Sequence, residues 1–265
     1  MSPVDKDGPY KRAVGFMHAV EERSYTRKQE WSLGTAFFHE AYPVKWVLNF
    51  MRIERDDPAA SAEDVVTEAD AVMGAAGLSH RMLHTDNAEV ADRLRPGLES
   101  LGWRSEQLLV MALGSVPPVY AAEDVKVREV PQDEMFEVAK RAAVEHFPEE
   151  ADHADQLARS REVTIKAADG ISLGGCIDGE IAGSCDFYDG GDVGQIEDVD
   201  TFERFRKRGV AKALVTTAIA MSQQQGHDLT FLVADDTDWP KDFYARLGFV
   251  PVGYLYEFRK TDKGY

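Results

Sequence analysis

The sequence predicts an α/β protein in which a mixed sheet carries helices on both faces. Its second half alternates short apolar or β-branched runs with segments whose apolar residues recur every three or four positions. Turn signals such as Asp178-Gly179 separate these segments. The first half shows a weaker form of the same alternation, which points to two related copies.

A proline pair marks the predicted boundary between the two halves. Pro117 and Pro118, in the stretch Gly114–Asp124, can neither continue a helix nor lie inside a sheet. At 265 residues the chain is long enough for two small domains. We therefore expect a first domain over 1–115, a linker over 116–124 and a second domain over 125–262.

The second half reads as β α α β β β α β α β. Strands are expected where residues alternate or form a continuous apolar run: Val125–Val130, Ile171–Ile177, Glu180–Tyr188, Val193–Thr201, Leu229–Ala234 and Val252–Phe258. Helices are expected where apolar residues follow the helical spacing: Gln132–Glu145, His153–Ser160, Gly209–Gln224 and Trp239–Leu247. Gly226 suits the end of the third helix and Pro240 the first turn of the fourth.

Composition limits the classes of partner. The formal net charge of −17 disfavours nucleic acids and anionic lipids and favours cationic molecules such as amines, although it also fits plain solubility. No apolar run reaches the roughly 20 residues of a membrane helix, and the first residues are polar, so we expect a cytoplasmic protein. Cys176 and Cys185 are interpreted as free, buried thiols on neighbouring strands. The chain could be a monomer or a homodimer.

The segment Ile196–Val215 has the pattern of an anion-binding turn. A strand ends, a basic turn follows, and a glycine opens a helix whose first N–H groups are unpaired. Gly209 lets the backbone approach a phosphate closely, and Ala211 is the next smallest choice. Arg206 to Arg208 and Lys212 concentrate positive charge in a half that is otherwise acidic. A solvated basic helix start would look the same from spacing alone.

Arg206-x-x-Gly209-x-Ala211 resembles the diphosphate signature (Q/R)-x-x-G-x-(G/A) of the GNAT N-acetyltransferases, and the whole segment resembles that family's string I-E-D-L-x-V-x-P-x-Y-R-G-x-G-I-G. Lys207 stands where glycine is usual, Thr201 where valine is usual and Glu203 where proline is usual. The resemblance implies the GNAT fold and acetyl-CoA as acyl donor. It assigns cofactor contacts to Val199, Asp200, Thr201, Arg206, Lys207, Arg208, Gly209, Val210, Ala211, Lys212 and Thr237. The last of these replaces a common asparagine, which leaves its contact in doubt.

The same resemblance suggests an acid and a base for acyl transfer. Tyr244, in Y-x-x-L-G-F, matches the tyrosine that protonates the leaving thiolate in the family, and a tyrosine is protonated at neutral pH. Only one of the adjacent residues Glu197 and Asp198 should point into the acceptor cleft, because neighbouring strand residues point to opposite faces unless a bulge re-aims them. In family members with this I-E-D pattern the Glu can accept the amine proton through a water, so the resemblance makes Glu197 the first choice of base and Asp198 the second. Both carboxylates could instead be structural. The backbone N–H of Val199 is the candidate to hold the thioester oxygen.

The histidines give weaker signals. His84 with Asp86 has no third ligand nearby, so no metal site is expected. His146 and His153 flank a predicted acceptor-side loop and could touch substrate.

Residues 31–113 look like a degenerate second copy without the chemistry. A helix is predicted over Ser61–Ala76, with Ser61 and Asp64 as a capping box, followed by strands over Arg81–Thr85 and Gln107–Leu113. Leu98 stands where the acid tyrosine would be, and the turn before the helix is acidic. Residues 1–24 could form an amphipathic helix or be partly disordered.

These observations favour an enzyme that transfers an acetyl group from acetyl-CoA to a primary amine by direct attack in a ternary complex. The acidic surface favours a cationic small-molecule acceptor, and a protein lysine or N-terminus remains open. The alternative is a CoA-binding sensor or interaction protein that has lost turnover.

Overall fold

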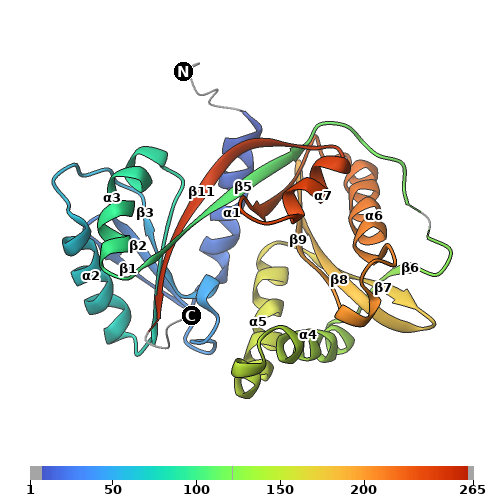
Figure 1. Cartoon of the computed structure of the whole chain (residues 1–265), viewed down its shortest axis with the longest axis horizontal. Coiled ribbons are helices and arrows are strands. Elements are labelled where there is room, and N and C mark those ends of the chain that lie inside the picture. Colours follow the sequence, from blue (N-terminus) through green and yellow to red (C-terminus); the bar gives the residue numbers. More distant parts are fainter. Residues whose placement is uncertain (1–7, 121, 262–265) are drawn as a thin grey trace. The chain divides into compact units, whose positions relative to one another are not determined.

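The computed structural model describes residues 8–120 and 122–261. Its strands, coloured along the chain in Figure 1, are β1 (Arg27–Trp31), β2 (Gly34–Phe38), β3 (Phe50–Ile53), β4 (His80–Thr85), β5 (Arg104–Leu113), β6 (Lys126–Glu129), β7 (Ile171–Ile177), β8 (Glu180–Asp189), β9 (Val193–Thr201), β10 (Leu229–Asp235) and β11 (Phe249–Thr261).

Its α-helices are α1 (Pro9–Ser24), α2 (Ala62–Ala75), α3 (Ala88–Ser100), α4 (Gln132–His146), α5 (Ala154–Ala167), α6 (Val210–Gln225) and α7 (Pro240–Arg246). Short 3-10 turns occur at Trp46–Leu48, Pro148–His153 and Glu203–Phe205. Among the described residues, no helix is both long enough and apolar enough to cross a membrane.

The chain forms two compact units whose boundaries differ from the predicted ones. Among the described residues, unit one holds 8–20, 110–120, 122–233 and 239–252, and unit two holds 21–109, 234–238 and 253–261. The start of α1 belongs to unit one because Phe16 packs edge-on against Phe231 and Arg12 pairs with Asp192 and Asp228. The end of β11 belongs to unit two because it pairs with β4. Sequence-local patterns could not show either exchange, since both depend on contacts between distant segments.

Unit one is built on strands in the order β5-β10-β9-β8-β7-β6. Strands β6 to β9 are antiparallel neighbours, whereas β9 and β10 run parallel, so the sheet is mixed as predicted. Helices cover both faces, and Figure 1 shows α5 and α6 on opposite sides of β8 and β9. The sequence explains this: on β8, Gly183 faces Val210 of α6, while Asp186 points the other way and pairs with Arg161 of α5.

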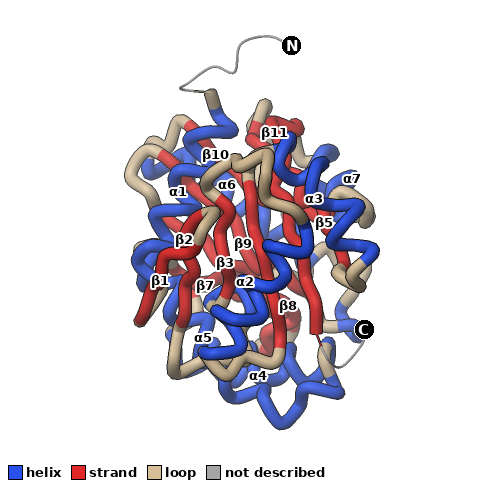
Figure 2. Tube along the Cα trace, turned by 90° about the vertical axis from the view of Figure 1, so that its left-hand side faces the viewer, coloured by secondary structure: helices blue, strands red, loops and turns tan. Residues whose placement is uncertain are grey.

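Unit two carries strands in the order β1-β2-β3-β4-β11. Figure 2 shows α2 and α3 in front of these strands, and the core between them is apolar, with Phe37, Met51 and Leu83 almost fully buried. The predicted capping box is confirmed, because the Ser61 hydroxyl accepts from the Asp64 N–H and the Asp64 carboxylate accepts from the Ser61 N–H.

Several predicted elements are confirmed in detail. The strands Ile171–Ile177 and Val193–Thr201 have the predicted bounds, and Gly226 ends α6 with φ +83°. Cys176 and Cys185 are free and buried on neighbouring strands, as expected. The predicted helix over His153–Ser160 is longer in the structure, and the predicted last strand over Val252–Phe258 extends at both ends. Residues 9–24 are helical, and residues 1–7 lie outside the described part.

Candidate active site

The turn before α6 has the geometry of an anion site. Gly209 caps the helix with φ +84°, and no side chain from the described residues caps its first N–H groups. Lys207 also has a positive φ, +64°, at the position where the resembling family carries glycine. The backbone thus turns sharply twice before the helix begins, which leaves the open amides and the positive end of the helix dipole for an anion.

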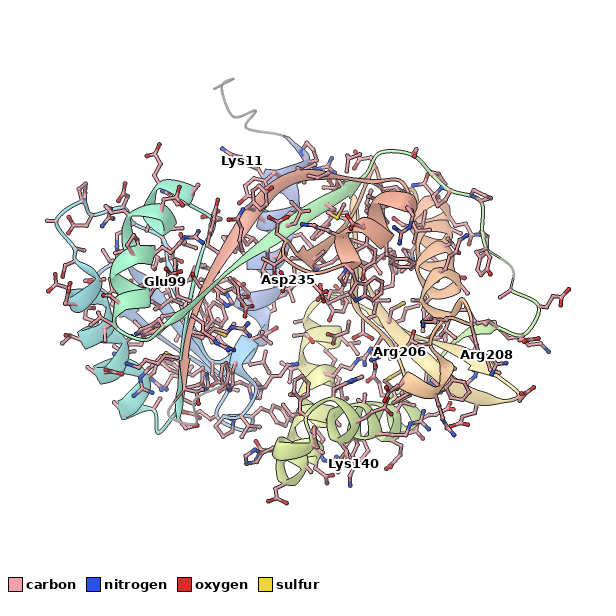
Figure 3. All side chains as sticks on the ribbon, viewed as in Figure 1. Lys11, Glu99, Lys140, Arg206, Arg208 and Asp235 are labelled. Atoms are coloured by element: carbon pink, nitrogen blue, oxygen red, sulfur yellow. The ribbon has the colours of Figure 1, made fainter. Side chains whose placement is uncertain are left out.

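Four basic side chains are exposed around this turn: Arg206, Lys207, Arg208 and Lys212. Figure 3 shows Arg206 and Arg208 on the loop that leads into α6. The Arg206 Nε–H donates to the Thr201 carbonyl over 3.4 Å, and Arg208 pairs with Asp124 at 3.3 Å. These contacts are exposed and therefore weak, so an incoming anion can compete for the same cations.

Strand β9 has a free edge that leads directly into this turn. The pairing of β10 with β9 joins Leu229–Phe231 to Val193–Gln195. Within the described part of the chain, no strand pairs with Val199 to Thr201 on that side of β9. Such an edge can accept an extended chain as an additional strand.

A β-bulge re-aims the two candidate carboxylates. On β8, Ser184 and Asp186 are two residues apart, but their partners on β9, Asp200 and Glu197, are three apart. The extra residue is accommodated by Asp198, whose φ is +49°. The simple alternation expected of a strand is therefore broken between Glu197 and Val199, where the free edge begins.

Glu197 is the less exposed of the two carboxylates. It is half-buried, and burial, with help from the nearby charge of Asp198, raises its pKa to about 8. The Gln195 side-chain amide donates to its Oε2 over 2.5 Å. Asp198 is exposed by comparison. At neutral pH the Glu197 carboxyl therefore holds its proton for much of the time and can exchange it.

Tyr244 lies inside unit one on α7, with 9% of its surface exposed. Burial, followed by the charges of Glu197 and Cys185, raises its pKa above the ordinary value. Its ring packs against Phe243 and Phe249. The phenol is thus protonated throughout the neutral range. Burial also raises the pKa of the Cys185 thiol, so that thiol is no nucleophile at neutral pH.

A buried ion pair beneath the carboxylates was not anticipated from the sequence. Arg161 of α5 donates two hydrogen bonds to Asp186, of 2.7 and 2.8 Å, and the Ser172 hydroxyl donates to the same carboxylate over 2.7 Å. Asp186 is fully buried and lies opposite Glu197 across the β8–β9 pair. The pair ties α5 to the strand beside the base candidate.

The side of unit one formed by α4 and α5 holds a cavity of about 460 Å³. Asp133, Glu137 and Glu162 contribute carboxylates to its lining, and Phe136 contributes an aromatic face over which Arg159 lies. Arg161 reaches the same cavity from α5. At the end of α4, the His146 Nε2 lies 2.9 Å from the Asp200 Oδ2, which links this helix to the free part of β9.

The geometry gives less support to one sequence-based expectation, the cofactor contact of Thr237. Thr237 falls in unit two, where its N–H and hydroxyl both donate to the Asp235 carboxylate over 2.7 Å. Its hydroxyl is thus engaged locally. Within the described residues, no group of three His, Cys, Asp or Glu side chains is placed to hold a metal ion.

Comparisons with known proteins agree with this geometry. Residues 132–249 match the sequence model of the family described as "Acetyltransferase (GNAT) family". This match contains β9, the turn, α6 and Tyr244. A search of curated proteins finds no match to the chain.

Solved structures resemble almost the whole chain. A functionally unknown conserved protein from Staphylococcus epidermidis is 16% identical, with a TM-score of 0.71 over 88% of this chain and 92% of that one. A GCN5-related N-acetyltransferase from Kribbella flavida is 19% identical, with a TM-score of 0.61 over 94% of each chain. A tandem GNAT protein from the clavulanic acid biosynthesis pathway is 11% identical, with a TM-score of 0.57 over 93% of this chain and 87% of that one. At these identities the likeness shows a shared fold.

Proposed function

Because residues 132–249 form a domain of the GNAT acetyltransferase family, we propose that the chain transfers an acetyl group from acetyl-CoA to the primary amine of a cationic small molecule. The observation that carries this proposal is the free edge of β9, which leads through the short 3-10 turn Glu203–Phe205 to the uncapped start of α6. An extended arm followed by a diphosphate needs these two features in this order. Acetyl-CoA has that shape.

Each part of the donor has a set of residues to hold it. The backbone of Val199, Asp200 and Thr201 would pair with the amides of the pantetheine arm. The open amides from Lys207 to Lys212 would bind the diphosphate, helped by the cations of Arg206 and Arg208. Thr237 is the weakest member of the predicted set, since Asp235 already takes its hydroxyl.

The proton transfers can be assigned to two residues. Glu197 takes a proton from the acceptor ammonium, and the freed amine attacks the thioester carbonyl carbon. The Val199 N–H stabilises the oxygen on which negative charge develops. As the carbon–sulfur bond breaks, Tyr244 gives its proton to the departing sulfur, while the nitrogen releases its second proton to solvent, from which Tyr244 is reprotonated. The raised pKa values of both groups suit these directions, because Glu197 exchanges a proton near pH 8 and Tyr244 stays protonated until it is needed.

A cationic acceptor is proposed from charge. The α4–α5 cavity presents Asp133, Glu137 and Glu162, and the whole chain carries −17. Arg159 contributes one positive charge to the lining, and Arg161 adds little because Asp186 neutralises it, so the carboxylates remain in excess. We expect the protein to work in the cytoplasm, as a monomer or a homodimer.

The test is release of free CoA thiol from acetyl-CoA in the presence of a panel of amines, together with calorimetry of CoA binding. Turnover with small cationic amines is the expected result. Turnover only with peptides bearing lysine or a free N-terminus would move the acceptor to proteins. Binding without turnover on any amine would favour a CoA-binding sensor, and no binding at all would refute the proposal.

A further inference from the structure

The segment that joins the two halves of the sequence lies against α6, the helix that begins at the proposed diphosphate-binding turn. We call Gly114–Tyr120 the strap. Its first end is fixed where the Gly114 and Ser115 N–H groups donate to the Gly248 carbonyl over 2.9 and 3.3 Å. Its far end is fixed where the Tyr120 N–H donates to the Thr216 hydroxyl of α6 over 3.0 Å. The strap is therefore a bound part of unit one rather than a free linker.

The side chain of Tyr120 runs along α6 towards the start of the helix. Its backbone is held at Thr216, two turns into α6, but its ring lies against Gly209. A Cβ built on Gly209 would lie 2.8 Å from the ring Cε1 and 3.1 Å from the hydroxyl oxygen. Positions 209, 212 and 216 share one side of the helix, so the phenol hydroxyl points to the end where the amides are open.

The ring of Tyr120 also contacts Lys212, one of the four basic residues around the turn. The Lys212 Nζ lies over its ring, 4.2 Å from the centroid, which is a cation–π contact. Within the described residues, the structure gives the Tyr120 hydroxyl no hydrogen-bond partner. A half-buried phenol is thus presented beside a lysine ammonium and the uncapped amides of Gly209 and α6.

We propose that Tyr120 is a ligand of the CoA diphosphate: its hydroxyl donates to a phosphate oxygen while its ring holds Lys212 against the same group. This inference rests on the proposed function and adds a residue from outside the matched family region 132–249. It also gives Gly209 a second role. The missing side chain at that position makes room for the tyrosine as well as for the backbone turn.

Calorimetry with CoA on the full chain tests the proposal, using Tyr120→Phe, Tyr120→Leu and, as a control tyrosine from unit two, Tyr42→Phe. The Phe variant keeps the ring and loses only the hydroxyl, so we expect CoA to bind about tenfold more weakly. The Leu variant also loses the cation–π contact and should bind more weakly still. Pantetheine, which lacks the diphosphate, should bind the wild type and the Phe variant alike, and Tyr42→Phe should bind CoA like the wild type.

Other outcomes overturn the proposal in distinct ways. Equal CoA affinity in the wild type and Tyr120→Phe would show that the hydroxyl does not reach the phosphates. Tighter binding in either Tyr120 variant would show that the strap covers the site instead of completing it. A parallel loss for pantetheine, or a lowered unfolding midpoint, would point to a structural effect. If the wild type itself does not bind CoA, the proposed function fails first and this inference falls with it.

Discussion

Lys207 has a left-handed backbone conformation that costs an L-residue about 1–2 kcal/mol. Replacing it with glycine removes that strain. Glycine is also more flexible in the unfolded chain, and this greater loss of conformational entropy on folding costs about 0.5–1 kcal/mol. We therefore expect Lys207→Gly to raise the free energy of unfolding by about 0.5–1 kcal/mol, measured in urea. The neighbouring Arg206 has φ −59°, so Arg206→Gly should lower it. The same sign for both variants would contradict the strain argument.

The hydroxyl of Tyr244 is expected to affect the rate of acetyl transfer and not the affinity for CoA. Tyr244→Phe should lower kcat by about a hundredfold, because the thiolate then leaves without a proton donor, and should leave CoA affinity nearly unchanged. Single-turnover kinetics and calorimetry separate the two effects. Tyr256→Phe, which also alters a buried tyrosine but in unit two, is the control. A large loss of CoA affinity with normal turnover would remove Tyr244 from the acid role.

Glu197 sets a pH dependence that can be measured. Since its pKa is raised to about 8, the carboxylate form grows as pH rises from 6 to 8, and kcat/KM should rise with it and then level off. Glu197→Gln should abolish this limb. Asp198→Asn should shift it to lower pH, because the Asp198 charge helps to raise the pKa of Glu197. If Asp198→Asn instead abolishes the limb, Asp198 is the base.

At the scale of elements, the pair between α5 and β8 is the contact most sensitive to a single change. Arg161→Met would leave the fully buried Asp186 without its cation, and we expect a loss of about 3–5 kcal/mol in the free energy of unfolding. The double variant Arg161→Met with Asp186→Leu should recover most of it. Arg159→Met, on the same helix, removes only a cation–π contact with Phe136 and should cost about 1 kcal/mol or less. Equal losses for Arg159→Met and Arg161→Met in urea would refute this role.

The elements that sequence patterns predicted well are those defined within a few residues of chain. Strands β7 and β9 follow from alternation bounded by turns, and the start of α6 follows from Gly209 and the basic residues before it. The bulge at Asp198 could be named only as an exception to alternation, because it is a mismatch between two strands and the register of β9 against β8 cannot be read from either strand alone. Arg161 and Asp186 were missed for the same reason, since they meet only once α5 folds onto β8. Tyr120 was hidden because its surroundings read as a linker.

At the scale of the whole molecule, the net charge of −17 should act on the acceptor before it binds. An acidic surface attracts cationic amines over distances that salt screens, so raising ionic strength from about 0.05 to 0.5 M should lower kcat/KM for such amines several-fold. An aromatic amine, which is neutral at the same pH, should show little change. Equal salt sensitivity for the cationic and the aromatic amine would place the effect at the turn before α6, where CoA is proposed to bind.

The exchange of segments between the units links the two halves of the chain more closely than a linker would. Strand β11 and helix α1 each begin in unit one and end in unit two, whereas β5 begins in unit two and ends in unit one. A cut at the sequence boundary near Tyr120 would therefore remove a strand from one unit and most of a helix from the other. The unit definitions, rather than the proline pair, should guide any attempt to express the halves apart.

The pairing of Tyr256–Thr261 with β4 also has a consequence during synthesis. A ribosome delivers β4 long before these residues exist, so the edge of β4 that they will occupy stays open while the rest of the chain is translated. Unit two, which contains most of the first half of the polypeptide, is thus the last unit to gain all of its strands. A nascent chain stalled shortly before Tyr256 would expose that edge to other strands and to chaperones.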